Sequence, residues 1–280
     1  MGVCNSKCSE RFLSQGEIVL ANQSYNKEDI EDINANDSFA LKNVLRGYFC
    51  RKSLFHKKTR VLGKILLKKP NLSWVESRAL HDGLYTGQMQ NEKKHGLGEL
   101  TIYPSSYYYG YFSNGLFEGL GILTTSDSTY EGNFLKGKKS GYGSLTSKKT
   151  SYTGHFSEDL YQGQGTEIWH NNCKYTGDFV IGKKHGKGRC EFANGDIYEG
   201  EFFNSKFSGT GTFYWQSGKK YAGQWKDGLM HGDGHVYWAN GNFFKGSFNQ
   251  GKKQGHGMLY KDGKTVQGWW ENGKRLKESQ

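Results

Sequence analysis

The sequence has little proline and no long hydrophobic run, and each shortage excludes a class of protein. Only two of the 280 residues are proline, which excludes a collagen-like chain even though 40 residues are glycine. No stretch of eighteen apolar residues occurs, so we expect no transmembrane helix. The first residues lack the apolar segment of a secretory signal, so we expect none.

Cysteine is also scarce, and its spacing excludes two kinds of site. The five cysteines, Cys4, Cys8, Cys50, Cys173 and Cys190, are odd in number and follow no disulfide-framework spacing, which favours a reducing compartment. They have no C-x-x-C spacing, and we expect no metal and no cofactor. No Ser-His-Asp or Cys-His set stands out either, and we expect no enzyme activity.

Acidic charge is absent from one part of the chain. The net charge is +11, but residues 1–40 carry −4, residues 41–75 carry +10 with no acidic side chain, and residues 76–280 carry +5. The basic character is therefore local, and the high pI does not indicate nucleic-acid binding.

The residues that are present favour short strands joined by tight turns. Hydrophobic residues make up 35% of the chain and aromatic residues 15%, a share that disordered chains lack. Abundant glycine and aromatic residues with almost no proline are typical of many turns between strands.

An aromatic-x-Gly tripeptide recurs at a nearly constant step of 22 or 23 residues. There are eight full copies and a degenerate ninth that begins with valine. Their first residues are Tyr85, Tyr108, Tyr130, Tyr152, Tyr175, Tyr198, Tyr221, Phe244 and Val266. Such a period is the signature of a repeat architecture.

Two further features define each unit. A second large apolar residue lies four positions after the first aromatic, so both point to the same face of a strand with a glycine between them. A Gly-x-Gly pair follows about eleven residues after the start, and an apolar residue such as Leu100 or Val236 lies two positions beyond it. Glu167 is the exception at that position. Each unit therefore predicts a β-hairpin.

Turn signals agree with this prediction. Asn114-Gly115 lies between the strands of one unit and Asn194-Gly195 lies between two units. A lone hairpin is marginal in water, so the units must stack edge to edge. The predicted fold class is an all-β repeat ribbon: an elongated, twisted antiparallel sheet of stacked hairpins, preceded by a basic helical segment and a disordered N-terminus. We expect the glycines to make room for aromatic rings that lie across the sheet.

The residues of these units resemble MORN (membrane occupation and recognition nexus) repeats, for example residues 198–202 and 221–234. The resemblance covers about residues 83–274, with eight full repeats and one degenerate repeat. It implies an extended antiparallel sheet and roles in membrane attachment, phosphoinositide binding and scaffolding at the cell cortex. Some relatives self-associate, so a homodimer is an open option. Others join the repeats to a lipid kinase or a methyltransferase, and no such domain is visible here.

The first residues match an N-myristoylation pattern, with Gly2 next to the initiator methionine and Ser6 at the required position. A single myristoyl chain binds a bilayer only weakly, so a second signal is needed. Cys4 and Cys8 are candidate palmitoylation sites. We expect residues 1–38 to form a flexible acylated segment, although an ordinary unstructured start would read similarly.

In residues 39–69, apolar side chains are interleaved with Lys and Arg, which predicts an amphipathic helix. Its first part resembles an IQ motif, which binds calmodulin or related EF-hand proteins. By that resemblance Leu41 and Leu45 enter the partner, Arg46 and Arg51 pair with its acidic rim, and Gly47 permits close approach. The motif departs from the family at residue 42, where Lys stands in place of Gln.

Two other interpretations of this segment remain open. The helix could lie on anionic lipid through the basic residues Lys52, Lys57, Lys58, Arg60, Lys64, Lys68 and Lys69. Alternatively, it could cover the edge of the first repeat through Leu62, Ile65, Leu66 and Trp74.

Four units carry paired lysines at the same phase, namely Lys93-Lys94, Lys138-Lys139, Lys183-Lys184 and Lys252-Lys253. This pattern predicts a row of lysines along one edge of the ribbon. The row could bind lipid headgroups, or it could keep the edge soluble. His95, His185 and His231 share a phase and are interpreted as surface residues.

Together these features predict a non-catalytic scaffold, lipid-anchored on the cytoplasmic side of the plasma membrane or at the cell cortex. Its partners would be anionic lipids, an EF-hand protein such as calmodulin, and unidentified proteins bound by the sheet. The alternatives are a soluble cytoskeletal or ciliary assembly protein that self-associates, and an accessory subunit of a lipid kinase.

Overall fold

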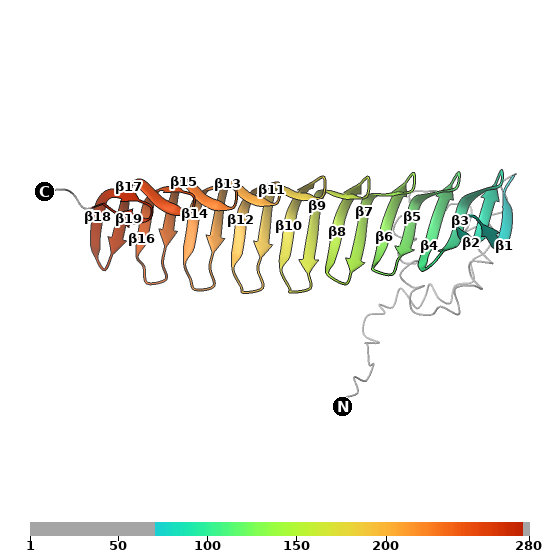
Figure 1. The fold of residues 1–280 in the computed structure, drawn as a ribbon, viewed down its shortest axis with the longest axis horizontal. Helices are drawn as coiled ribbons and strands as arrows, with labels where there is room; N and C mark the ends of the chain where they lie inside the picture. The colour runs from blue at the N-terminus through green and yellow to red at the C-terminus, as the bar shows by residue number, and fades with distance from the viewer. Residues whose placement is uncertain (1–70, 277–280) are drawn as a thin grey trace, which may run out of the picture. The chain divides into compact units, whose positions relative to one another are not determined.

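The described part of the protein is a single β-sheet. A computed structural model describes residues 71–276, and these residues form an open antiparallel sheet of nineteen strands (Figure 1). They contain no helix, and hence none that is long and apolar enough to cross a membrane. The predicted antiparallel sheet of stacked hairpins is confirmed, while the predicted helical segment and N-terminus lie outside the described residues.

The strands are short and evenly spaced along the chain. Their bounds are β1 Ser73–Leu80, β2 Gly83–Gln90, β3 Lys93–Ile102, β4 Ser106–Ser113, β5 Leu116–Thr124, β6 Ser128–Leu135, β7 Lys138–Ser147, β8 Thr150–Ser157, β9 Leu160–Trp169, β10 Lys174–Val180, β11 Lys183–Glu191, β12 Ile197–Phe203, β13 Lys206–Tyr214, β14 Lys220–Lys226, β15 Leu229–Tyr237, β16 Phe243–Asn249, β17 Lys252–Lys261, β18 Lys264–Glu271 and β19 Lys274–Arg275.

The order of strands in the sheet is their order in the chain. Each strand pairs in antiparallel fashion with the next one, from β1–β2 to β18–β19. We number the hairpins as repeats, so that repeat 1 is β2 and β3, repeat 8 is β16 and β17, and repeat 9 is β18 and β19. All strand pairings between repeats are therefore between neighbours.

The turns within repeats follow from the residues at their centres. Asn114 and Gly115 both have positive φ, at 50° and 88°, as do Asp227 and Gly228 at 51° and 84°. Two positive φ values in a two-residue loop define a type I′ turn, whose twist matches that of the flanking strands. The turns predicted from Asn-Gly and Asp-Gly are therefore present.

One strand was not predicted. Residues 73–80 form β1, which pairs with β2 from Ser73 opposite Met89 to Leu80 opposite Gly83. The edge of repeat 1 is thus covered by a strand, and Trp74 belongs to that strand. Assigning Trp74 to a covering helix was wrong. The other residues of the predicted helix lie outside the described residues.

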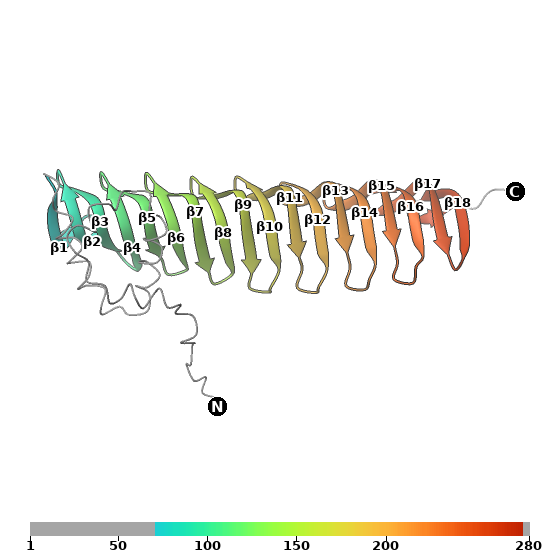
Figure 2. The same cartoon turned by 180° about the vertical axis from the view of Figure 1, so that it is seen from behind.

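A β-bulge recurs in repeats 1 to 8, at the first glycine of the Gly-x-Gly pair. In repeat 5 the register shifts between Gly177 and Asp178, and Gly186 on the opposite strand has a φ of 56°, which glycine adopts easily. A bulge bends its strand and increases the local twist. Because the bulges lie at the same level in every repeat, the strands bend together, and Figure 2 shows curved strands.

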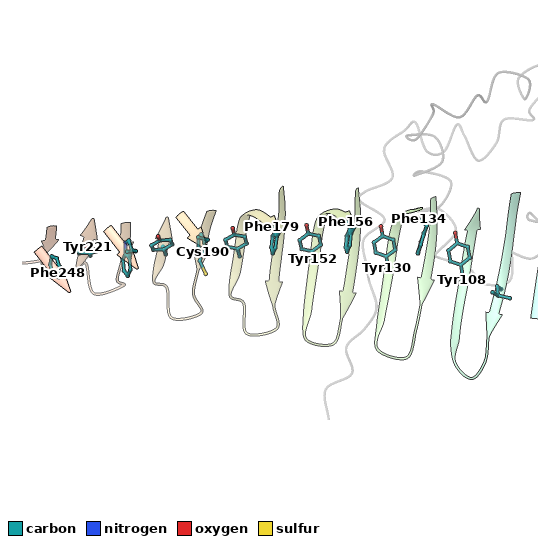
Figure 3. Close-up of a cluster of buried hydrophobic side chains, with 14 of the residues drawn as sticks. Tyr108, Tyr130, Phe134, Tyr152, Phe156, Phe179, Cys190, Tyr221 and Phe248 are labelled. Atoms are coloured by element: carbon teal, nitrogen blue, oxygen red, sulfur yellow. The ribbon is translucent and has the colours of Figure 1, made fainter. Parts of the chain in front are cut away.

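The core lies on one face of this single layer, which we call the inner face. The first aromatic residue of every full repeat is at most 1% exposed, and the second large apolar residue at most 7% exposed. Tyr130 meets Phe134 of its own repeat and Phe156 of the next in edge-to-face contacts, each with centroids 5.0 Å apart (Figure 3). The core is therefore a continuous line of rings that joins each repeat to the next.

Candidate functional site

The floor of the inner face is made by tyrosine rings that lie over glycines. At Gly211, a hypothetical Cβ would lie 2.4 Å from the hydroxyl oxygen of Tyr198. The rings can lie flat across the sheet only because these positions lack side chains. Burial raises the pKa of the tyrosine hydroxyls, so they remain protonated donors.

Each of the seven tyrosines also satisfies the backbone at the bulge. Its hydroxyl donates to the carbonyl oxygen three residues later, as from Tyr175 to Asp178 at 2.9 Å and from Tyr221 to Gln224 at 2.8 Å. The same bond recurs at Tyr85, Tyr108, Tyr130, Tyr152 and Tyr198. A bulge interrupts the ladder of backbone hydrogen bonds, and the hydroxyl supplies a donor at that point. This role of the tyrosine hydroxyls was not predicted from the sequence.

A second layer of side chains lies over the tyrosine floor. It comes from the second residue of the second strand in each repeat. Phe117 and Tyr161 stack on Tyr108 and Tyr152 of their own repeats, with centroids 3.7 Å apart. In repeats 1, 3, 5 and 8 this position holds a lysine, and these four are Lys94, Lys139, Lys184 and Lys253. They are the second members of the predicted lysine pairs.

The prediction of a full row of edge lysines was therefore wrong for half of its members. Lys94 is 5% exposed, and the other three inner lysines are partly buried, whereas Lys93, Lys138, Lys183 and Lys252 are exposed. Alternation along the strand gives the reason, because the second lysine of each pair shares a face with Phe117 and Tyr161 at the same phase. Equal phase with those aromatics was the signal available in the sequence.

These lysines reach across the inner face. The ammonium nitrogen of Lys184 lies 4.3 Å from the ring centroid of Trp169 and 5.3 Å from that of Tyr175. Lys184 lies opposite Phe179, and Ile168, the neighbour of Trp169, lies opposite Lys174. Lys174 and Phe179 are five residues apart on β10, which corresponds to about 16 Å on a straight strand. A lysine side chain does not span that distance, so the contact requires the strands to curve toward the inner face. We call this curved inner face the trough.

Three trough lysines have a carboxylate partner. Lys94 pairs with Asp82, and Lys139 lies 3.6 Å from Asp159. Lys184 lies 3.7 Å from Glu167, the residue that interrupts the apolar pattern. Burial raises the pKa of the Glu167 carboxyl, and the charge of Lys184 opposes that rise. The break in the pattern thus marks a charge pair within the aromatic layer.

The opposite, outer face carries a polar groove as well as exposed rings such as Tyr142 and Trp269. An open groove of about 550 Å³ crosses repeats 5 to 7, with Glu199 and Glu201 among its lining residues. Arg189 pairs with Glu199, and Thr210 donates to Glu201 at 2.7 Å through its hydroxyl and 3.0 Å through its amide. These hydrogen bonds lower the pKa of Glu201. The carboxylates of the groove are already bound within the protein.

A row of exposed apolar side chains follows the hairpin turns of repeats 2 to 7, one or two in each repeat. Its members are Leu116, Leu135, Leu160, Val180, Ile181, Phe203 and Leu229. Ile181 is 67% exposed and has a φ of 48°, a conformation that β-branched residues disfavour. This row was not predicted from the sequence, because some of its members precede the turn and others follow it.

The described cysteines and histidines belong to the same repeats. Cys190 occupies the apolar position of its strand, and burial raises the pKa of its thiol to about 11. Cys173 and Cys190 are both free thiols. Within residues 71–276, no three or more His, Cys, Asp or Glu residues gather as metal ligands would. His185 packs against Phe203 with centroids 5.1 Å apart.

The acylation residues, the IQ-like residues and the lipid-contact residues all precede residue 71. They therefore lie outside the described residues.

The repeats can now be compared with known families. The model of the MORN repeat matches eight segments, namely residues 85–104, 108–129, 130–150, 152–174, 175–197, 198–220, 221–243 and 244–265. The chain belongs to the MORN-repeat family. Each matched segment begins at or next to the floor aromatic of repeats 1 to 8, so the family repeat and the structural hairpin coincide. As a MORN protein it is a repeat scaffold, and the matched segments indicate no catalytic family.

Two solved structures share a weak likeness with this MORN protein. The TCP domain of SAS-4 (dCPAP) from Drosophila melanogaster, in complex with a proline-rich motif of Ana2 (dSTIL), has 12% identity and a TM-score of 0.33. That match covers 55% of this chain and 85% of the other. The TCP10 domain of CPAP from Danio rerio, in complex with a STIL peptide, has 11% identity and a TM-score of 0.36, covering 69% and 97%. Neither likeness bears on function. No curated protein sequence matches the chain significantly.

Proposed function

We propose that this MORN protein is a membrane-attached scaffold that recruits partners through its sheet. The observation that supports the proposal is the open single-layer sheet of eight matched repeats, whose length leaves a trough, an outer face and a row of apolar turns accessible together. In such a repeat array the binding surface grows with the number of repeats, which suits a scaffold.

The attachment would come from the start of the chain. Gly2 would carry a myristoyl group, and Cys4 or Cys8 a palmitoyl group, because one acyl chain alone holds a protein only reversibly. The basic residues from Lys52 to Lys69 would add attraction to an anionic leaflet, worth about 1 kcal/mol for each one near the surface. The expected location is the cytoplasmic side of the plasma membrane or the cell cortex.

Fractionation of cells tests the anchor. The full chain should carry a tag at its C-terminus, so that Gly2 stays free. We expect Gly2→Ala to move the protein from the membrane fraction to the soluble fraction, and Cys4→Ser to do so partly. Ser9→Ala is the matched control, because it lies beside the anchor and outside the acylation pattern. Membrane recovery of Gly2→Ala equal to that of wild type would refute the anchor.

Regulation by an EF-hand protein is a separate part of the proposal. The segment from Leu41 to Arg51 would bind calmodulin, and the same basic stretch could then be released from lipid. We expect the full chain to bind calmodulin in the micromolar range or tighter, and Leu45→Asp to abolish that binding. Lack of binding both with calcium and with a calcium chelator would remove this part and leave the anchor untouched.

Self-association into a cytoskeletal assembly is the second candidate. It is favoured by the edge of β18. Among the described residues, β19 pairs only with Trp270 and Glu271, and Leu276 and Arg275 donate to the carbonyl oxygens of Trp269 and Gln267. The first part of β18, from Lys264 to Val266, pairs on that side with no other described strand. An exposed strand edge is a template for pairing with another chain. Light scattering at two protein concentrations would reveal such assembly. Pelleting with cytoskeletal filaments in the absence of lipid would separate it from membrane scaffolding.

A further inference from the structure

Two lysines in the trough stand beside three aromatic rings near its C-terminal end. Lys253, the second residue of β17, has its ammonium nitrogen 4.5 Å from the ring centroid of Phe244 and 5.1 Å from that of Trp238. Lys219 lies in the turn before β14, with its nitrogen 4.2 Å from the centroid of Trp215. Both lysines are partly buried.

Among the described residues, Lys219 and Lys253 lack the carboxylate partner that the trough lysines of other repeats have. The lysines at the position of Lys253 in repeats 1, 3 and 5 each pair with a carboxylate of the protein. Within residues 71–276, no carboxylate oxygen lies within 4.0 Å of the nitrogen of Lys253 or Lys219. Instead, the pKa of Lys253 is lowered by burial and then by the positive charge of Lys219, and burial lowers the pKa of Lys219.

The sequence explains the missing carboxylate. In repeat 5, Lys184 is neutralised by Glu167, which lies opposite Tyr175. The residue opposite Phe244 in repeat 8 is Val236, a buried apolar side chain. In repeat 3, Lys139 is neutralised by Asp159, the second turn residue of the next repeat, and the equivalent residue after repeat 8 is Gly273. In repeat 1, Lys94 pairs with Asp82, three residues before Tyr85, and the residue three before Phe244 is Gly241. All three positions that supply acid elsewhere are uncharged here.

Two partly desolvated ammonium groups without a counter-charge are unfavourable, and an added carboxylate would relieve that cost. We propose that Lys219 and Lys253 bind the side-chain carboxylate of an acidic peptide segment, seated in the trough between Trp215 and Trp238. This inference rests on the proposed scaffold function and specifies the chemistry of one partner.

The choice of a carboxylate and of a peptide has separate reasons. The protein itself places Asp159 and Glu167 beside trough lysines, which shows that the layer over the rings accommodates a carboxylate. The surroundings are aromatic and half-buried, so a ligand with apolar groups on both sides of its charge gains contact area that a small anion does not. Indole rings in such positions are typical anchors of protein interfaces. The preferred segment therefore carries Asp or Glu flanked by apolar residues.

Selection from a random peptide library on the immobilised, unacylated full chain identifies the segment, and fluorescence anisotropy then measures its affinity. We expect enrichment of Asp or Glu next to apolar residues. Lys219→Gln and Lys253→Gln should each weaken the best peptide about tenfold, as should Gln or Asn in place of its acid, because each change removes a charge-assisted hydrogen bond. Lys245→Gln, on the exposed outer face of repeat 8, should change affinity by less than about twofold.

A second pair of variants tests the missing-carboxylate argument directly. Val236→Glu places an acid at the position that Glu167 occupies before Lys184, so it should neutralise Lys253 internally and weaken the peptide about tenfold or more. Val236→Gln has the same size without the charge and should bind the peptide better than Val236→Glu. Unchanged tryptophan fluorescence and far-UV circular dichroism identify the variants that are folded.

Several outcomes would overturn the inference. These are selected peptides without an acid, no enrichment at all, or equal binding by Lys219→Gln/Lys253→Gln and wild type. Binding of phosphatidylserine-containing vesicles through the same two lysines, with no peptide selected, would assign the site to a lipid instead. Because the chain is unacylated, failure of the anchor test would not affect these results, and their failure would leave the anchor standing.

Discussion

Replacing a floor glycine should destabilise the sheet by forcing a buried ring to move. In Gly211→Ala, the new Cβ would meet three atoms of Tyr198, at 2.4 Å (Oη), 2.6 Å (Cζ) and 2.8 Å (Cε2). Ordinary carbon contacts are about 3.5–4.0 Å, so the ring or the strand must shift by about 1 Å. The backbone at Gly211 has no positive φ, so the clash alone is tested.

The ring of Tyr198 has no room to shift. It is fully buried, Phe207 stacks on it at 3.8 Å, and its hydroxyl donates to Glu201 at 3.0 Å. Overpacking of this kind costs about 1–3 kcal/mol, and loss of the hydroxyl bond adds about 1 kcal/mol. We therefore expect Gly211→Ala to lower the free energy of unfolding by about 2–4 kcal/mol.

A matched variant isolates the clash. At Gly268 the three atoms nearest to the added Cβ would belong to the guanidinium group of Arg275, an exposed and flexible side chain, with the closest at 2.9 Å. Gly268→Ala should therefore cost less than about 1 kcal/mol. Tyr198→Leu removes the ring, so the double variant Tyr198→Leu/Gly211→Ala should be more stable than the sum of the single changes by at least about 1 kcal/mol.

Urea denaturation followed by tryptophan fluorescence measures these differences on the full chain. Repeat arrays can depart from two-state unfolding, so amide exchange in β12 and β13 should be measured as the local readout. The reasoning is refuted if Gly211→Ala unfolds like wild type, or if its cost adds to that of Tyr198→Leu without coupling.

Three further predictions follow from individual contacts. Tyr175→Phe should cost about 1–2 kcal/mol in urea denaturation, because the carbonyl of Asp178 loses its buried donor. Ile181→Asn should raise the free energy of unfolding by about 0.5–1 kcal/mol, since Asn tolerates the positive φ that strains Ile; an equal or lower free energy of unfolding would contradict this. For Glu167, the raised pKa of the folded state means that protonation favours folding: this contribution is complete below the ordinary pKa near 4.5 and is lost as pH rises through the raised value. Wild type should therefore gain stability relative to Glu167→Gln as pH falls from 7 to 5, and parallel pH profiles would contradict this.

Much of this fold could be predicted because the sequence signals for each hairpin lie within a single repeat. The 22- or 23-residue step, the Asn-Gly and Asp-Gly turns and the alternation around each glycine predict hairpins, their stacking and the buried face. The strand β1 carries none of these signals. It forms because β2 presents an unpaired edge, and pairing at an edge depends on backbone groups more than on side-chain pattern.

The candidate site was harder to predict because it depends on curvature. A period of two places Lys184 and Glu167 on the same face, but their registers along the sheet differ by several residues. Only the repeated bulges bend the strands enough to bring Lys184 to Trp169 and Glu167. The hydrogen bonds of the tyrosine hydroxyls depend on the same bulges. The register shifts at these bulges could not be predicted from the sequence.

The repeats depart from their own pattern at the end where we infer the peptide site. Phe244 replaces the floor tyrosine and lacks its hydroxyl, and Val266 replaces the ring altogether. Lys253 keeps the trough position of the other lysines, but Val236 occupies the position that Glu167 occupies before Lys184. Each repeat contacts only its neighbours, so such departures weaken one junction without disturbing the rest of the sheet. A scaffold built this way can reserve one end for binding, because the regular repeats maintain the fold while the irregular ones are free to leave a charge for a partner to neutralise.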